Sequence, residues 1–262
     1  MILNNKKGII FGIANDHSIA WGIAKKLYEN GAELAITYQN ETLKKRVEPL
    51  AKKLNSELII ECDFNNSNAL EKTYDLVKNK WQKLDFIIHA VAFSEKKELN
   101  GRYIDTSKKN FLNSLNISCY SLTKIAKIYQ PILNEGGSLL TLSFYGSQKV
   151  MPNYNVMGVA KAALETSVKY LCVDLGSNNI RINAISAGPM RTLAGAAIAN
   201  AREVFKFTEE NSSLKRNVML EEIGNAAMYL VSDLSSGVTG EIHYVDCGFN
   251  IIGMPKDNLG NF

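Results

Sequence analysis

One tyrosine and one lysine, Tyr154 and Lys161, stand seven positions apart in the stretch NYNVMGVAKAAL, residues 153–164. The stretch is predicted to be helical, and at about 100° per residue seven positions return to within about 20° of one direction. We therefore expect a phenol and an ammonium group on one helix face, among small apolar neighbours. A half-buried tyrosine and a surface lysine would give the same pattern, so its meaning depends on the elements that position the pair.

The composition is that of a globular protein with a sizeable core. The chain has 262 residues, of which 46% are hydrophobic and 21% charged, with a net charge of +4. Its basic pairs are scattered among acidic residues, which indicates solvated helix faces and argues against nucleic acid as a partner. No apolar run approaches the roughly 20 residues of a membrane span, and no signal peptide precedes the first strand, so we expect a cytoplasmic protein without a membrane partner.

The cysteines and histidines show no metal-binding pattern. The four cysteines are far apart, which predicts reduced thiols, and His89 lies inside an apolar strand, which favours a buried, hydrogen-bonded histidine. We expect no metal site from these residues: Cys62, Cys119, Cys172, Cys247, His17, His89 and His243.

Strands and helices alternate along the whole chain. Short apolar runs predict strands at 7–14, 32–38, 57–63, 84–92, 137–144, 180–186 and 241–246. Helical spacing predicts helices at 18–30, 41–54, 67–82, 107–133, 154–176, near 193–209 and at 220–232. This order is typical of an α/β fold, a doubly wound parallel seven-stranded sheet of the Rossmann-like kind, in a single domain that spans 1–262.

Ligands of such a sheet bind at the carboxyl ends of its strands, and the first strand ends in a glycine loop. Gly12 allows the backbone to approach a pyrophosphate, and Ser18 is expected to cap the following helix, whose N-terminus attracts phosphate. An ordinary strand–helix turn explains the same loop, and the loop alone does not decide between the two interpretations.

The next two strand ends supply groups for an adenosine. Gln39 follows the second strand, where an acidic residue favours NAD and an arginine favours NADP. Gln39 can bind ribose hydroxyls, and no basic residue follows it directly, which favours NADH over NADPH. Asp63 ends the third strand, where it would accept from the adenine amino group or serve as a plain turn residue.

Five stretches carry a resemblance: GIANDHSIAWGIA, GAELAITYQNE, LTLSFYGSQKVMPNYNVMGVAKAALE, IRINAISAGPMRTLA and SGVTGEIHYVDCGF. Through them the chain resembles the short-chain dehydrogenase/reductase superfamily along nearly its whole length. It is most similar to the bacterial NADH-dependent enoyl-acyl-carrier-protein reductases, in which six residues separate the tyrosine and the lysine. Ordinary members carry Tyr-x-x-x-Lys and a serine about 17 residues before the lysine, where this chain has Met157 and Phe144.

The resemblance implies a reaction of type II fatty-acid synthesis. Hydride passes from NADH to the β-carbon of a trans-2-enoyl thioester, Tyr154 stabilises the enolate, and Lys161 holds the nicotinamide ribose. It further implies a substrate-binding segment at about 186–210. The family commonly has a second tyrosine at Phe144, and strand alternation turns Tyr145 the other way, so we expect that position to line the pocket and not to take part in the chemistry.

The resemblance also assigns residues to the two ligands. The expected cofactor-binding residues are Gly12, Ser18, Ile19, Gln39, Asp63, Phe64, Ala90, Ala92, Lys161, Met190 and Thr192. The expected substrate-binding residues are Phe93, Tyr145, Tyr154, Met157, Ala194 and Ile198.

Expected partners follow from the same resemblance. They are an acyl carrier protein that carries the substrate, docked by Arg202 and Lys206, and further copies of the chain in a homotetramer in which the 107–133 helix and its successor form one interface. Triclosan-type biphenyl ethers are expected inhibitors. Two other interpretations stay open: a ketone reductase, against which Phe144 and Met157 argue, and a non-catalytic dinucleotide sensor, against which Tyr154 and Lys161 argue.

Overall fold

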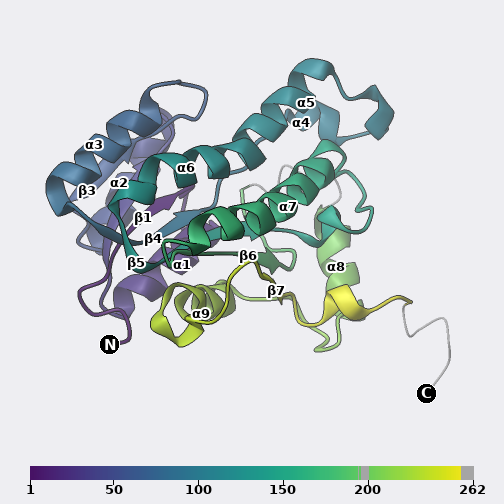
Figure 1. Cartoon of the computed structure of the whole chain (residues 1–262). Coiled ribbons are helices and arrows are strands. Elements are labelled where there is room, and N and C mark those ends of the chain that lie inside the picture. The colour runs from purple at the N-terminus through teal and green to yellow at the C-terminus, as the bar shows by residue number, and fades with distance from the viewer. Residues whose placement is uncertain (194, 196–200, 255–262) are drawn as a thin grey trace.

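The computed structural model describes residues 1–193, 195 and 201–254, and its centre is one parallel sheet of seven strands (Figure 1). The strands pair in the order β3-β2-β1-β4-β5-β6-β7, every pair parallel. They are β1 (Lys7–Phe11), β2 (Glu33–Tyr38), β3 (Leu58–Glu61), β4 (Leu84–His89), β5 (Leu133–Ser143), β6 (Arg181–Ala187) and β7 (Ile242–Val245). The predicted doubly wound fold is confirmed.

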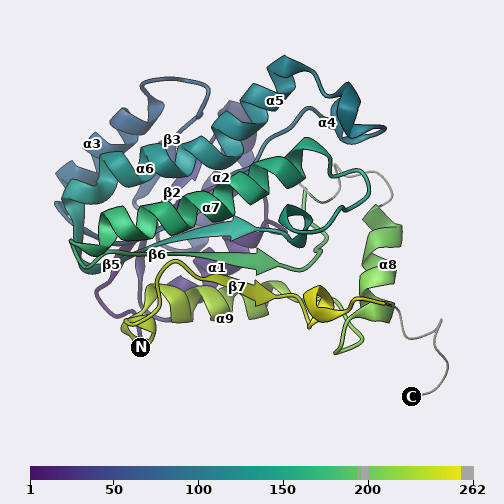
Figure 2. The ribbon, with the colours of Figure 1, turned by 45° about the vertical axis from the view of Figure 1, so that its right-hand side comes forward.

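Helices cover both faces of the sheet. Figure 2 shows α6 and α7 on one side and α1 and α9 on the other. The α-helices are α1 (Ile19–Glu29), α2 (Glu41–Lys53), α3 (Ala69–Trp81), α4 (Lys96–Leu99), α5 (Lys108–Leu115), α6 (Ser121–Tyr129), α7 (Val156–Gly176), α8 (Ala201–Asn211) and α9 (Leu220–Val231). The 3₁₀ turns are η1 (Tyr103–Asp105), η3 (Gln130–Ile132), η4 (Tyr145–Ser147), η6 (Asp233–Ser235) and η7 (Phe249–Ile251), and η2 (Asn116–Tyr120) is a π-helix.

Two hydrophobic clusters fill the space between the sheet and its helices. One joins strand residues such as Ile10 and Ile36 to α1, α2 and α9. The other joins strand residues such as Ile9 and Ile87 to α3, α6 and α7. Because neighbouring strand residues point to opposite faces, the continuous apolar runs of the strands supply both clusters at once.

The predicted helix 107–133 is wrong as one element. It is α5, the π-helix η2, α6 and the 3₁₀ turn η3 in succession, and β5 already begins at Leu133. Pro131 lies in η3, where its missing N–H and fixed φ end the helical hydrogen bonding. Leu133 then pairs with Leu84 of β4, so long-range pairing decides the boundary.

The start of α7 is a second difference. The helix begins at Val156, so Tyr154 lies in the turn before it and not on its face. The expected helix near 193–209 also differs, because α8 covers Ala201–Asn211 and 194 and 196–200 lie outside the described residues. No described helix is long and apolar enough to cross a membrane.

Candidate active site

The strand order reverses between β1 and β4, and Gly12 lies at this point. Its φ is +106°, and a Cβ there would stand 2.1 Å from the carbonyl oxygen of Ala90, which follows β4. The Ala90 N–H also donates to the carbonyl of Phe11 at 3.0 Å. Only glycine fits here, and the loop after β1 packs directly against the end of β4, at the place where doubly wound sheets bind dinucleotides.

Ser18 does not cap α1, which corrects the prediction. Its Oγ accepts from the N–H groups of Ala14 and Asn15, at 3.1 and 3.0 Å, and donates to the Asn15 side chain. The loop turns back on the hydroxyl, so the serine orders the glycine loop and makes no bond to the helix N-terminus. Ile19 then begins the helix, whose first turn carries no acidic residue and suits a phosphate.

Gly22 packs helices and does not approach the strand ends. A Cβ on it would meet Leu220 of α9 at 3.0 Å, and one on Gly224 would stand 3.0 Å from the Gly22 carbonyl. The two glycines let α1 and α9 pack backbone to backbone.

The ends of β2 and β3 come together as predicted for an adenosine site. Gln39 Nε2 donates to Asp63 Oδ1 at 3.4 Å, and the same oxygen accepts from the Asn65 backbone at 3.0 Å. Asp63 is therefore both a turn residue and a neighbour of Gln39. Lys44 is engaged with Glu41 at 3.2 Å and lies over the Tyr38 ring.

His89 ends β4 as a buried structural residue, as expected. Its ring nitrogens lie 2.7 Å from the hydroxyls of Thr141 and Ser121, and Phe64 packs edge-on against it. Burial, and then the charge of Lys161, lower the pKa of His89 to about 3, so the ring is neutral at pH 7. A neutral ring has a single N–H, so one of the two hydroxyls must donate to it.

Tyr154 is held by its neighbours in an unusual turn. Asn153 and Asn155 on either side have positive φ values of 59° and 38°, and Asn155 combines this φ with a ψ of −120°, which residues other than glycine rarely adopt. The Asn155 side chain donates to the carbonyls of Glu98, Leu99 and Gly101 at 3.1–3.3 Å and so ties the α4 region to the start of α7.

The Tyr154 ring itself is buried against the end of β5. It packs edge-on against Phe144 with 4.9 Å between centroids, and a Cβ on Gly146 would lie 2.5 Å from it. Burial, and then the charge of Glu165, raise the pKa of Tyr154 well above its usual value. The phenol therefore keeps its proton at neutral pH and can donate a hydrogen bond.

Lys161 reaches the same strand end from α7. Its Nζ donates to the Leu142 carbonyl at 2.7 Å, and the residue is only 6% exposed. Burial lowers the pKa of Lys161 to about 8, although Cys119 and Glu165 act in the opposite direction. The prediction that Tyr154 lies on one face of the helix with Lys161 is therefore wrong, but both side chains contact the end of β5.

The predicted substrate residues divide between two sides of the turn after β5. Met157 clusters with Leu99 and Tyr154, and its Sδ lies 3.8 Å from Ser118 Oγ, which also bonds the Phe93 backbone. Tyr145 points the other way, as expected, and packs edge-on against Tyr244 and Phe249.

The last predicted contacts lie after β6. Met190 packs on the core, and the Thr192 hydroxyl accepts from the Gly195 N–H at 2.9 Å. Ala92 is exposed beyond β4, whereas Ala194 and Ile198 lie outside the described residues. Three residues that hold the pair in place were not predicted from the sequence: Glu165, Gly146 and Asn155. The carboxylate of Glu165, four residues after Lys161, was a signal for the first of them.

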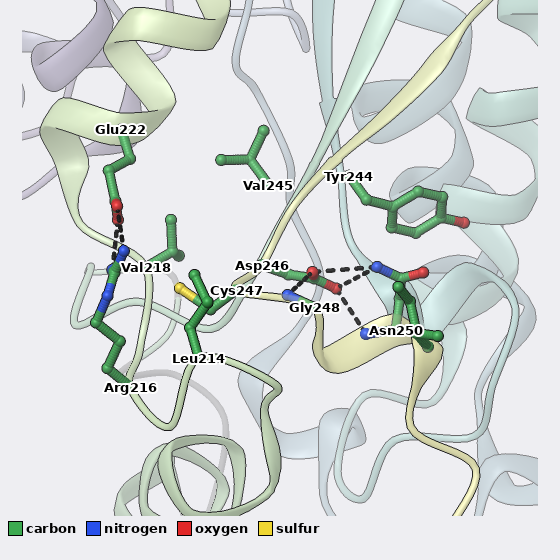
Figure 3. Close-up of a pocket in the computed structure, with 11 residues that line it drawn as sticks. Leu214, Arg216, Val218, Glu222, Tyr244, Val245, Asp246, Cys247, Gly248 and Asn250 are labelled. Atoms are coloured by element: carbon green, nitrogen blue, oxygen red, sulfur yellow. Dashed lines mark hydrogen bonds and ion pairs between the residues drawn. The ribbon is translucent and has the colours of Figure 1, made fainter.

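A cavity of about 490 Å³ lies elsewhere, between the start of α9 and the end of β7 (Figure 3). An ion pair of Arg216 with Glu222 borders it, at 2.6 Å, and Asp246 bonds Asn250 across its other wall. None of the predicted cofactor or substrate residues lines it. We place the candidate site at the ends of β1 and β5, because Gly12 and the buried pair of Tyr154 and Lys161 lie there. In the described part of the chain no three His, Cys, Asp or Glu residues form a metal-holding group, and the four thiols are free.

The chain is similar to known proteins along nearly its whole length. The family described as "Enoyl-(Acyl carrier protein) reductase" matches residues 12–250. A curated relative from Rhizobium meliloti, Enoyl-[acyl-carrier-protein] reductase [NADH] 2, is 56% identical over 97% of this chain and 95% of its own length.

Two solved structures show the same fold. The enoyl-(acyl-carrier-protein) reductase of Anaplasma phagocytophilum, in complex with NAD, is 54% identical with a TM-score of 0.94 and covers 98% of both chains. The Bacillus cereus enoyl-acyl carrier protein reductase, with NADP+ and an indole naphthyridinone, is 43% identical with a TM-score of 0.94 and covers 97% and 99%.

Proposed function

Because this chain belongs to the enoyl-(acyl carrier protein) reductase family, we propose that it reduces the double bond of a trans-2-enoyl thioester on acyl carrier protein in type II fatty-acid synthesis. The single observation that carries the proposal is the buried pair at the end of β5, Tyr154 against Phe144 and Lys161 on the Leu142 carbonyl. NADH, when bound, supplies the hydride that reaches the β-carbon.

The strand ends fit a dinucleotide. Gly12 gives the backbone its close approach, the α1 N-terminus suits the pyrophosphate, and Gln39 with Asp63 suits the adenosine. We assign the cofactor to these residues and to the further ones that the sequence indicates, Ser18, Ile19, Phe64, Ala90, Ala92, Lys161, Met190 and Thr192.

Tyr154 acts on the substrate as a hydrogen-bond donor. As charge gathers on the thioester oxygen, its O–H donates to the developing enolate, and a raised pKa keeps that proton on the phenol. Removing one such donor typically costs about 3 kcal/mol of transition-state stabilisation. Protonation at the α-carbon completes the saturated acyl chain.

Lys161 acts on the ribose. An ammonium group has three N–H donors, and one of them is used by Leu142. The other two can bind the nicotinamide ribose hydroxyls, and the positive charge favours electron density on the nearby thioester oxygen. Phe144 and Met157 leave no second acid at the positions that ketone reductases use.

The acyl chain is assigned to the segment 186–210 with Phe93, Tyr145 and Met157. Arg202 of α8 is exposed, while Lys206 pairs with Glu210 at 3.7 Å, and we propose that both dock the acidic carrier protein. A homotetramer is proposed as well, and a mass measurement in solution tests it. A cytoplasmic location remains a prediction.

Oxidation of NADH with crotonyl thioester tests the reaction. We expect efficient turnover with NADH and weaker use of NADPH, since Gln39 provides no charge for a 2′-phosphate. Both cofactors should be measured because the Bacillus cereus relative was crystallised with NADP+. If neither NADH nor NADPH supports turnover, the proposed function is rejected. If both cofactors are used with equal catalytic efficiency, only the cofactor preference is rejected.

A phenolic inhibitor provides a second test. A phenolate resembles the enolate that Tyr154 faces, and ligands that resemble a transition state bind more tightly than substrate. We propose that triclosan binds here together with NAD⁺ and contacts the segment 192–206. Hydrogen exchange should show more protection with both ligands than with either alone; equal protection would contradict this role of the segment.

A further inference from the structure

Glu165 is a buried carboxylate that the reaction described above does not use. It lies on α7, one turn after Lys161, and is 7% exposed. Its Oε1 accepts two short hydrogen bonds, from Ser143 Oγ at 2.5 Å and from Ser147 Oγ at 2.6 Å. A buried carboxylate is costly unless it is hydrogen-bonded, so this arrangement requires both serines.

The two serines mark the ends of the turn after β5. Ser143 is the last residue of β5, and Ser147 is the last residue of η4. One carboxylate oxygen therefore fastens both ends of the turn to α7. Without it, the turn would lose the two side-chain hydrogen bonds that join it to α7.

The fastened turn touches both members of the candidate catalytic pair. The Phe144 ring and the Gly146 backbone lie against the Tyr154 ring. The carbonyl of Leu142, directly before Ser143, accepts from Lys161 Nζ. A shift of this turn would thus move the phenol and the ammonium group together.

The carboxylate also acts through its charge. It raises the pKa of Lys161 against the effect of burial, and it contributes to the raised pKa of both Tyr154 and Tyr244. The titratable groups that face this region are Cys119 of η2, His89 of β4, Tyr154 before α7, Tyr244 of β7 and Lys161 itself. His89 is neutral and carries no charge that would oppose this effect. The negative charge of Glu165 therefore favours the protonated forms of the lysine and the phenols.

We propose that Glu165 is a positioning residue for enoyl reduction, which fastens the turn 143–147 so that Tyr154 and Lys161 keep their places. The proposal rests on the proposed function for its catalytic part. The effect of the carboxylate's negative charge on Lys161 concerns cofactor binding alone and can be judged without any enoyl substrate.

The central experiment is Glu165→Gln, which keeps the shape and removes the charge. We expect kcat with crotonyl thioester to fall at least about tenfold, since a neutral amide oxygen accepts more weakly from the two serines than a carboxylate does, and small misplacement of reacting groups is costly. We also expect the affinity for NADH, measured by fluorescence across pH 6 to 10, to weaken at a lower pH in Glu165→Gln than in the wild-type enzyme. The reason is that loss of the negative charge lowers the pKa of Lys161 below about 8.

Two further variants separate charge from geometry. Glu165→Asp keeps the charge but is too short to reach both serines, so we expect the pH midpoint to be restored while kcat stays low. Asp174→Asn removes one negative charge from the exposed end of the same helix and should change neither quantity.

Ser147→Ala covers the case in which Glu165→Gln does not fold. It removes one donor from the half-buried end of the network, and we expect a lower kcat with little change in the melting temperature. Where both variants fold, the double variant should be no slower than Glu165→Gln, because the two residues act through one contact.

Several outcomes would overturn the proposal. One is a Glu165→Gln enzyme whose kcat is within about twofold of the wild-type value and whose NADH binding has the same pH midpoint as that of the wild-type enzyme. A second is a double variant in which the two losses of kcat multiply, as they do for independent residues. A third, where only Ser147→Ala folds, is an unchanged kcat in that variant. If the original chain binds NADH but reduces no enoyl thioester, the proposed function fails, and the pH midpoint of NADH binding still decides the charge role of Glu165.

Discussion

At the scale of single residues, the site depends on how closely the backbone approaches the Tyr154 ring. Gly146 is not in a left-handed conformation, yet its missing side chain is required because a Cβ would lie 2.5 Å from that ring. The ring that would be displaced here belongs to the proposed hydrogen-bond donor. We therefore expect the reaction to be sensitive to residues that do not themselves contact the substrate.

Gly146→Ala should displace the Tyr154 ring and lower kcat by about a hundredfold, with NADH affinity nearly unchanged. The measurement is steady-state turnover of crotonyl thioester beside a fluorescence titration of NADH. Gly176→Ala is the matched control, since nothing lies within 4 Å of a Cβ at that end of α7. Equal activity of the two variants would contradict the close approach.

Tyr154→Phe and Lys161→Ala should separate turnover from cofactor binding. The phenol acts when charge develops on the thioester oxygen, so its loss should lower kcat by roughly a hundredfold and leave NADH affinity nearly unchanged. The lysine acts on the ribose in every state, so its loss should weaken NADH binding. If titration shows NADH binding equally weakened in both variants, the two roles are wrongly assigned.

At the scale of elements, the junction between α4 and α7 holds the turn that carries Tyr154. Asn155 combines a φ of 38° with three side-chain contacts to the carbonyls of residues 98–101. The backbone there is in a sparsely populated conformation, which costs about 1–3 kcal/mol unless the surroundings hold it.

Asn155→Ala should lower the free energy of unfolding by about 2 kcal/mol, because it loses the contacts and keeps the unfavourable φ. Asn155→Gly loses the same contacts but tolerates the φ, so it should lose about 1 kcal/mol less. Urea unfolding of the two variants measures the difference. An equal loss would mean that backbone conformation contributes nothing at this junction.

At the scale of the whole molecule, the buried His89 links stability to pH. Its pKa is about 3 in the fold against about 6.5 in an unfolded chain, because burial disfavours the charged ring. Between these values the unfolded state binds the proton and the folded state does not. This residue therefore lowers stability as pH falls from about 6.5 toward 3, by at most about 1.4 kcal/mol per pH unit.

His89→Asn should flatten that dependence, since the amide can still bond the hydroxyls of Thr141 and Ser121 but does not titrate. Chemical unfolding at pH 7, 6, 5 and 4 gives the two curves, and carboxylates cancel in their difference. Parallel curves would show that His89 is protonated in the fold.

The sequence alone determined the architecture and the place at which a ligand site is expected. Apolar periodicity reports which residues are buried, and alternating strands and helices leave few topologies, so the sheet, its order of elements and the gathering of Gly12, Gln39 and Asp63 at the strand ends could be predicted. Spacing also singled out Tyr154 and Lys161 as candidates, although it placed Tyr154 on the helix, and strand alternation predicted the opposite directions of Phe144 and Tyr145.

Only the tertiary structure decided how these residues are held. Tyr154 leaves the helix because Asn155 takes a positive φ to reach residues 98–101, and Ser18 turns to its own loop although its position suits a cap. Glu165 finds its partners across 22 and 18 positions. Local pattern encodes burial and the period of an element, whereas these contacts join segments that become neighbours only after the sheet has formed.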